Sequence, residues 1–174
     1  MSFCAFRFTL FTLMRITTKS EKQTIKLGRK LAQKFKGGEI VGLVGELGSG
    51  KTILVKGIAQ GLEIKKTITS PTFVLMKIYN TNQKRIKGQI KTNKAKVIHE
   101  LPLCRLCHID AYRTKNAREL VDIGVSEYLG EPHTVCVIEW AEKVKKLLPK
   151  KAIIIKLSMG KKENERKIVL TEHR

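Results

Sequence analysis

The segment from Gly45 to Thr52 constrains the fold of this chain more than any other part of it. Its residues are Gly, Glu, Leu, Gly, Ser, Gly, Lys and Thr, which match the pattern G-x-x-x-x-G-K-S/T at every fixed position. The apolar run Glu39–Val44 comes directly before it, and Lys51–Gly61 carries apolar residues at helical spacing. A buried strand, a glycine-rich turn and a helix in this order predict a phosphate-binding loop (P-loop) in an α/β fold.

The residue types of this loop suit the phosphates of a nucleoside triphosphate with a magnesium ion. Glycines let the backbone N–H groups point inward, and the positive end of the following helix adds to the anion site. We expect Lys51 to contact the β- and γ-phosphates and the hydroxyl of Thr52 to bind Mg²⁺. The predicted nucleotide-binding residues of this segment are Gly45, Glu46, Leu47, Gly48, Ser49, Gly50, Lys51, Thr52 and Ile53.

Two predicted strands lead to an acidic residue, and both acids are candidate catalytic residues. The apolar run Val135–Ile138 leads to Glu139, and Leu101–Ile109 leads to Asp110. In open α/β sheets, ligand-facing groups gather at the carboxyl ends of the strands. A carboxylate there holds Mg²⁺ or orients the attacking water in phosphoryl transfer. We therefore predict that Glu139 binds the metal and that Asp110 acts from the γ-phosphate side.

The residues around these acids have less specific interpretations. Ser70–Thr72 precedes a predicted strand, where small hydroxylated residues can form a nucleotide-sensing loop, but by itself the segment indicates only a turn. His108 and Tyr112 flank Asp110, and we expect both to be packing residues.

Residues 104–108 read CRLCH, a string that also occurs at sites of covalent haem attachment. The segment is predicted to be a strand, in which residues three apart face opposite sides of the sheet. Cys104 and Cys107 are therefore poorly placed to share a haem or a zinc ion, and no second cysteine pair completes a zinc site. We expect buried free thiols, since three of the four cysteines lie in strand-like apolar runs.

Hydrophobic periodicity predicts the remaining elements. A helix over Thr17–Phe35 begins with a capping box formed by Ser20 and Gln23. The other expected elements are a strand over Phe73–Tyr79, a helix over Ala117–Leu129, and closing strands over Ile153–Leu157 and Lys167–Leu170 joined by the charged turn Lys161–Arg166. The alternation of strands and helices favours one domain with a mainly parallel sheet flanked by helices.

The length of 174 residues suits one such domain over 14–174, with an apolar extension at 1–13 in front of it. Two interpretations of the extension stay open: it is a loose tail, or Met14 is the true start and the extension is no part of the native chain. The extension lacks the small-residue cleavage site of a signal peptide. No apolar run approaches the roughly 20 residues that span a bilayer. We therefore expect a cytoplasmic protein.

The chain is strongly basic, with a formal net charge of +20. Charge is concentrated in a predicted insertion over Asn80–Glu100. Unpaired charges do not pack in a core, so the insertion is predicted to be an exposed loop or hairpin. A basic surface attracts nucleic acid or acidic partners, but a biased composition gives the same excess, and both explanations remain open. The basic residues of the insertion are Lys84, Arg85, Lys87, Lys91, Lys94 and Lys96.

The segments GELGSGKT, TSPTFVL, HIDAYR, DIGVSEYL and VIEW, in this order, closely resemble the bacterial TsaE family. The resemblance begins at about Ile16 and continues to the C-terminus. That family is the small ATPase of the machinery that makes threonylcarbamoyladenosine beside the anticodon of tRNAs. The resemblance implies a single P-loop domain that binds ATP or ADP with Mg²⁺, hydrolyses ATP slowly and works with the TsaB and TsaD subunits. It also makes a contact between the basic surface and tRNA worth testing.

The resemblance assigns roles to individual residues as well. Thr52 and Glu139 match the family's Mg²⁺ positions, and Asp110 matches an acid that is important for hydrolysis. The further matches are Ser70, Pro71 and Thr72 with a switch-like loop, Trp140 with the tryptophan beside the metal-binding acid, and Ser20 with a region near the nucleotide base.

Three other functions would use the same loop or the same charge. The main alternative is a small P-loop phosphotransferase, a nucleoside or metabolite kinase, although the sequence has no arginine-rich lid beyond the candidate Arg113. A GTP-binding switch is disfavoured because Asn93–Lys96 lacks the acid of the guanine-binding pattern N-K-x-D. A nucleic-acid binder without enzymatic activity would rely on the basic insertion.

Overall fold

The computed structural model describes residues 13–81 and 105–172. Within them, seven strands form one sheet: β1 (Met14–Thr18), β2 (Ile40–Val44), β3 (Met76–Asn80), β4 (Arg105–Asp110), β5 (Thr134–Glu139), β6 (Ile153–Met159) and β7 (Arg166–Glu172). Their order across the sheet is β1-β7-β6-β2-β5-β4-β3. The central strands β6, β2, β5 and β4 run parallel, and the edge strands pair antiparallel. This confirms the predicted single α/β domain and places its parallel part at the centre.

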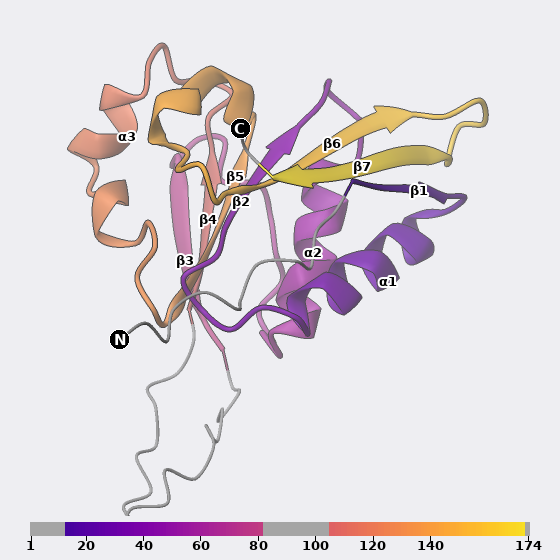
Figure 1. The fold of residues 1–174 in the computed structure, drawn as a ribbon, viewed down its shortest axis with the longest axis horizontal. Coiled ribbons are helices and arrows are strands. Elements are labelled where there is room, and N and C mark those ends of the chain that lie inside the picture. The colour runs from indigo at the N-terminus through magenta and orange to yellow at the C-terminus, as the bar shows by residue number, and fades with distance from the viewer. Residues whose placement is uncertain (1–12, 82–104, 173–174) are drawn as a thin grey trace, which may run out of the picture.

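Helices cover both faces of the sheet (Figure 1). The helices α1 (Glu21–Ala32) and α2 (Lys51–Gly61) pack on one face, where they share a core with Val41, Leu43 and Val137. The opposite face is covered by α3 (Arg118–Asp122) and the 3₁₀ helices η1 (Val125–Glu127) and η2 (Ala141–Leu147). All six residues of β5 are buried, as expected for a strand in the middle of a parallel sheet.

Glycines bring α1 and α2 unusually close to each other. A Cβ atom placed on Gly28 would lie 2.4 Å from the carbonyl oxygen of Leu54, and one on Gly57 would lie 2.3 Å from that of Ile25. Neither position has room for a side chain. Because α2 begins directly after the P-loop, this packing also fixes the position of the loop.

The first helix is shorter than predicted, because its first residues belong to an edge strand. Met14–Thr18 forms β1, which pairs antiparallel with β7. The helix starts after Ser20, whose Oγ accepts the N–H of Gln23 at 3.2 Å. The side chain of Gln23 accepts in return from the N–H of Lys19 at 2.8 Å. The predicted cap is therefore present, while the prediction of helix at Thr17 and Thr18 is wrong.

Two other predicted elements are interrupted by turns. The strand predicted over Phe73–Tyr79 begins only at Met76, since the N–H groups of Val74 and Leu75 bond the carbonyl of Pro71 in a turn. The helix predicted over Ala117–Leu129 is divided at Gly124, whose φ of 81° is a left-handed value that ends the regular helix.

Several predictions fall outside the described residues. These are the N-terminal extension at 1–12, the basic insertion at 82–100 and Cys104. In the described ranges, no helix is long and apolar enough to cross a membrane. The described cysteines, Cys107 and Cys136, are buried free thiols, as predicted. They are register partners on β4 and β5, and the hydrogen bond between them together with burial raises the pKa of the Cys136 thiol.

Candidate nucleotide-binding site

Three glycines of the P-loop adopt positive φ angles, which favour glycine over other residues. Gly45, Gly48 and Gly50 have φ values of 151°, 75° and 96°. A Cβ on Gly45 would lie 2.2 Å from the carbonyl oxygen of Leu157 in β6, so only glycine fits there. A Cβ on Gly48 would meet nothing within 4 Å. One side of the loop is thus closed against β6, and the other is open to an approaching ligand.

Lys51 already lies inside this loop. Its Nζ donates to the carbonyl oxygens of Gly45 at 2.6 Å and Glu46 at 2.9 Å, and lies 3.7 Å from the centroid of the Trp140 ring. Burial lowers the pKa of this ammonium, and the nearby Glu139, Glu142 and Asp110 carboxylates oppose that change. The loop therefore holds a partly desolvated positive charge where phosphates are predicted to bind.

The two predicted metal-binding residues contact each other. The hydroxyl of Thr52, in the first turn of α2, donates to the two carboxylate oxygens of Glu139 at 2.9 and 3.0 Å. Glu139 is the last residue of β5 and is buried. Two segments 87 residues apart in the sequence are thereby joined beside the P-loop.

The donor set fits a nucleotide-linked magnesium ion. Mg²⁺ favours oxygen ligands and commonly binds through one or two carboxylates together with substrate phosphates. Thr52 and Glu139 supply a hydroxyl and a carboxylate, and in the described part of the chain no group of three or more His, Cys, Asp or Glu side chains forms a metal cage. The buried hydroxyl of Ser49 in the loop has no hydrogen-bond partner within that part, which leaves a donor for a phosphate.

His108 makes a polar contact that the sequence did not predict. Its Nε2 lies 2.8 Å from Oε1 of Glu139, and the side chains are 0% and 3% exposed. The expectation of a purely packing residue was therefore incomplete. The register of β4 and β5 places His108 opposite Val137, so that it reaches Glu139 diagonally on the same face of the sheet.

Asp110 connects the predicted switch-like loop to the end of β4. Its Oδ2 accepts hydrogen bonds from the hydroxyls of Ser70 and Thr72, each at 2.6 Å. Its Oδ1 accepts from the N–H of Tyr112 at 2.9 Å. Pro71 is buried between the two hydroxyl residues. The structure thus brings Ser70, Pro71 and Thr72 to the predicted catalytic acid.

Trp140 lies beside Lys51 at the P-loop. It has a left-handed backbone with φ of 58°, and its ring centroid lies 4.9 Å from that of Tyr112. Tyr112 packs on Trp140 as expected of a packing residue, but it does so at the surface, where it is 45% exposed. Trp140 is the single tryptophan of the chain and contacts Lys51, which makes it a natural spectroscopic reporter of the loop.

Two further predicted nucleotide-binding residues lie at the edges of the loop. Leu47 is 75% exposed at its tip, and Ile53 is half-buried in α2. Ser20 caps α1, whose first residue Glu21 lies 3.8 Å from Lys56 of α2. The start of α1 therefore lies along α2, while a contact between Ser20 and the base remains a prediction.

Arg166 was missed by sequence reasoning, which had placed it at the end of a charged turn. Its side chain lies over the loop, and a Cβ on Gly50 would be 3.5 Å from its Nε. That Nε is buried without a partner in the described residues, while NH1 donates to the carbonyls of Glu163 and Glu165. No local sequence signal reveals this contact, because it depends on how the β6–β7 hairpin lies against the loop.

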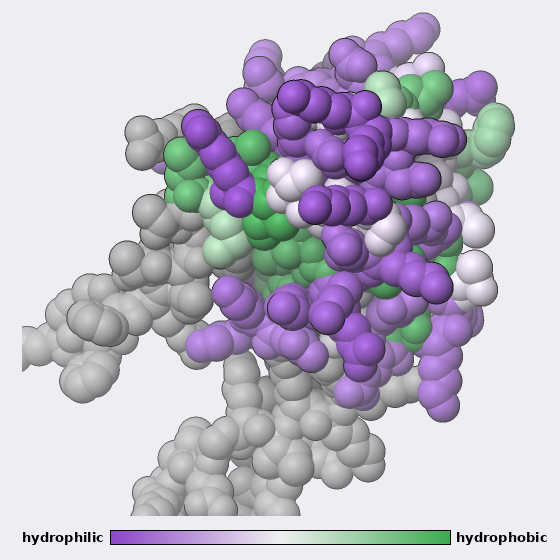
Figure 2. All heavy atoms as spheres, turned by 90° about the vertical axis from the view of Figure 1, so that its right-hand side faces the viewer, coloured by the Kyte–Doolittle hydropathy of each residue, from purple (hydrophilic) through white to green (hydrophobic). Residues whose placement is uncertain are grey.

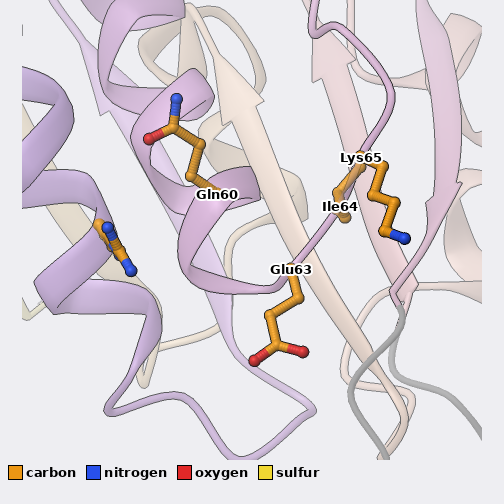
Figure 3. A pocket seen from close by; sticks show the side chains of 5 residues that line it. Gln60, Glu63, Ile64 and Lys65 are labelled. Carbon is orange, nitrogen blue, oxygen red and sulfur yellow. The ribbon is translucent and has the colours of Figure 1, made fainter.

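Two cavities differ in their relation to the P-loop. One of about 270 Å³ is lined by loop residues and the end of β6, namely Gly45, Glu46, Ser49, Leu157, Ser158 and Met159. The other, of about 470 Å³, is lined by Arg29 and by residues at the far end of α2. Its labelled side chains Gln60, Glu63 and Lys65 point in different directions (Figure 3), so they do not converge on a ligand. The smaller cavity adjoins the predicted chemistry.

Comparison with known proteins gives a consistent result. A sequence model described as "Threonylcarbamoyl adenosine biosynthesis protein TsaE" matches residues 18–168. Proteins named tRNA threonylcarbamoyladenosine biosynthesis protein TsaE are 35% identical over 144 residues in Treponema pallidum (83% of this chain and 90% of the relative) and 32% identical over 154 residues in Bacillus subtilis (88% and 82%). The crystal structure of Bacillus subtilis YdiB superposes with a TM-score of 0.68 at 26% identity, covering 94% of this chain and 87% of that one.

Proposed function

Since this chain belongs to the TsaE family of threonylcarbamoyl adenosine biosynthesis proteins, we propose that it is the component that binds and hydrolyses ATP in the modification of tRNA. The observation that carries the activity is the hydrogen bond between Thr52 and Glu139 beside the P-loop. A P-loop hydroxyl and a carboxylate from the adjacent strand end are the pair that holds Mg²⁺ in enzymes that act on nucleoside triphosphates.

Each element of the site has a role in this proposal. The P-loop amides and Lys51 bind the β- and γ-phosphates, and Lys51 exchanges the carbonyls of Gly45 and Glu46 for phosphate oxygens. Thr52 and Glu139 hold Mg²⁺, which neutralises charge on the phosphate oxygens when it is bound.

In this proposal, Asp110 orients the attacking water and responds to the state of the Ser70–Thr72 loop. The carboxylate accepts both loop hydroxyls. A movement of either hydroxyl residue would therefore change the hydrogen bonds of the acid. This link supports slow hydrolysis by the isolated chain and faster hydrolysis when a partner moves the loop.

The partners in this proposal are the TsaB and TsaD subunits, with tRNA as the substrate of the assembly in the cytoplasm. The names of the relatives refer to tRNA threonylcarbamoyladenosine biosynthesis, and the net charge of +20 favours a complex that contains a polyanion.

The decisive experiment measures ATP hydrolysis by the purified chain alone, with TsaB and TsaD, and with tRNA added. We expect Mg²⁺-dependent hydrolysis to water that rises when the partners are present. The same reactions, run with labelled γ-phosphate and a panel of nucleosides, test the kinase alternative. Transfer to an added nucleoside, with no effect of TsaB and TsaD, would favour a phosphotransferase and contradict the proposal.

A further inference from the structure

We propose that His108 is a positioning residue, whose Nε2–H holds Oε1 of Glu139 and thereby leaves Oε2 to face the magnesium ion. This inference rests on the proposed function, because it assumes that Glu139 binds Mg²⁺. It assigns to His108 a role in shaping the metal site, although His108 itself is no ligand and touches neither nucleotide nor metal.

The hydrogen bonds of the Glu139 carboxylate are divided unevenly. Thr52 has one hydroxyl proton, which is shared between Oε1 at 2.9 Å and Oε2 at 3.0 Å. His108 contacts Oε1 alone, at 2.8 Å. The Thr52 oxygen can bind a cation through a lone pair while its proton stays with either oxygen of Glu139. Among the contacts of the described residues, the bond from His108 is the one that distinguishes Oε1 from Oε2, and it thereby fixes the rotation of the carboxylate.

The chemistry of the pair determines which nitrogen of His108 carries the proton. A carboxylate has no proton to donate, so Nε2 is the donor in this pair. Nδ1 is buried and has no hydrogen-bond partner within the described residues. Among the described residues, Glu139 is therefore the polar group that holds the ring. The hydrogen bond fixes the orientations of the ring and the carboxylate relative to each other.

Packing alone does not account for a histidine here. The side chain is 0% exposed, and its same-face neighbours include the apolar Leu106 and Val137 as well as Asp110 on β4 and Lys77, its register partner on β3. An aliphatic residue would fill this space without burying an unpaired nitrogen. The polar edge of the ring is used at one place, the carboxylate predicted to bind metal. Hydrogen bonds of this kind to metal ligands commonly change metal affinity by about 10- to 100-fold.

The test compares His108→Leu, His108→Gln and His108→Asn. Leucine retains much of the volume and removes the donor. Glutamine carries an N–H group at the distance of Nε2, whereas asparagine carries the same amide nearer to the backbone. Each variant is titrated with Mg²⁺ at fixed ATP while the fluorescence of Trp140 is recorded, and ATP affinity is also measured without Mg²⁺.

We expect the Mg²⁺ concentration at half-saturation to rise by about tenfold or more in the leucine and asparagine variants and to return within about threefold of the parent in the glutamine variant. ATP affinity without Mg²⁺ should stay near the parental value in all three. Cys107→Ala is the matched control, because Cys107 is the buried neighbour on the opposite face of β4, and its Mg²⁺ dependence should be unchanged.

Parental Mg²⁺ dependence in His108→Leu, or in His108→Asn if the leucine variant does not fold, would reduce His108 to a packing residue and overturn the inference. Equal losses in the glutamine and asparagine variants would do the same. A parental protein that binds no ATP at all would instead overturn the proposed function, and the role of His108 with it.

Discussion

At the scale of single residues, the ammonium of Lys51 is the group on which nucleotide binding depends most directly. We predict that Lys51→Ala lowers ATP affinity by at least about tenfold, because hydrogen bonds to charged groups contribute about 1.5–3 kcal/mol. Isothermal titration calorimetry measures the change. Lys56→Ala is the matched control, since Lys56 lies on the same helix and its Nζ is 3.8 Å from Glu21 rather than in the loop. Unchanged ATP affinity in the Lys51 variant would contradict the P-loop assignment.

Variants of Glu139 and Asp110 test the hydrolysis step rather than the binding of ATP. We predict that Glu139→Gln and Asp110→Asn each remain folded and hydrolyse ATP about 10²–10⁴ times more slowly, since both lose a charge that positions a reacting group. The measurement is single-turnover hydrolysis with partner subunits present, and circular dichroism checks the fold. Parental rates in both variants would show that neither carboxylate has the assigned role.

Sequence reasoning predicted where side chains lie when a motif fixes their position, while the roles assigned to them stay predictions. Thr52 is in the first turn of a helix and Glu139 is at the end of a strand, so the parallel-sheet rule brings them to one edge. His108 and Arg166 could not be assigned in this way. The contact of His108 depends on the register of β4 and β5, and that of Arg166 on the placement of a distant hairpin.

At the scale of elements, the tight fit of the P-loop against β6 can be tested with two glycines that differ in their surroundings. Gly45 and Gly48 have positive φ values of 151° and 75°, but only a Cβ on Gly45 collides, at 2.2 Å from the Leu157 carbonyl oxygen. We predict that Gly45→Ala lowers the melting temperature by about 4–10 °C, and Gly48→Ala by about half of that or less.

Thermal unfolding without nucleotide measures this difference, and Gly48→Ala serves as the control for a side chain added at a positive φ without a collision. Equal melting temperatures for the two variants would mean that the loop moves away from β6 without cost. The loop would then not be held by the contact described above.

Sequence patterns predicted the elements that are defined locally and missed those defined by pairing. The helix over Lys51–Gly61 has the predicted bounds, since the loop fixes its start. Met14–Thr18 was predicted in part as helix, yet it is a strand because β7 pairs with it. The helix predicted over Ala117–Leu129 did not allow for the turn at Gly124. Local spacing does not report an edge strand whose partner is about 150 residues away.

At the scale of the whole molecule, basic residues line the exposed side of α1. Lys22, Lys26, Arg29 and Lys30 are exposed and follow one another at helical spacing, while the opposite side of the helix packs on α2. Figure 2 shows the face of the molecule that includes this side as mostly hydrophilic. Like charges four residues apart destabilise a helix by about 0.2–0.5 kcal/mol per pair. A polyanion would remove that repulsion.

We therefore predict that the triple variant Lys22→Ser, Lys26→Ser and Lys30→Ser weakens tRNA binding and flattens its salt dependence. Each lost phosphate contact reduces the slope of log affinity against log salt by about 0.7–0.9, so three contacts correspond to a change of about 2–3. Filter binding measures the tRNA affinity at salt concentrations between about 50 and 200 mM, and these affinities give the slope. ATP hydrolysis should be unaffected, because these residues lie outside the site.

The control must separate this surface from net charge alone. Lys145→Ser, Lys146→Ser and Lys150→Ser also remove three positive charges, in this case from exposed positions in and after η2. A second arm replaces Lys84, Arg85, Lys87 and Lys91 of the basic insertion with Ser. If all three sets shift the slope in proportion to the charges that they remove, the protein binds tRNA through its overall charge, and α1 is no specific surface. If only the insertion set acts, the contact lies there. If the parent binds tRNA and the α1 set leaves the slope unchanged, the lysines of α1 are solvated and do not contact tRNA. The repulsion along the helix would then follow from the basic composition of the chain alone.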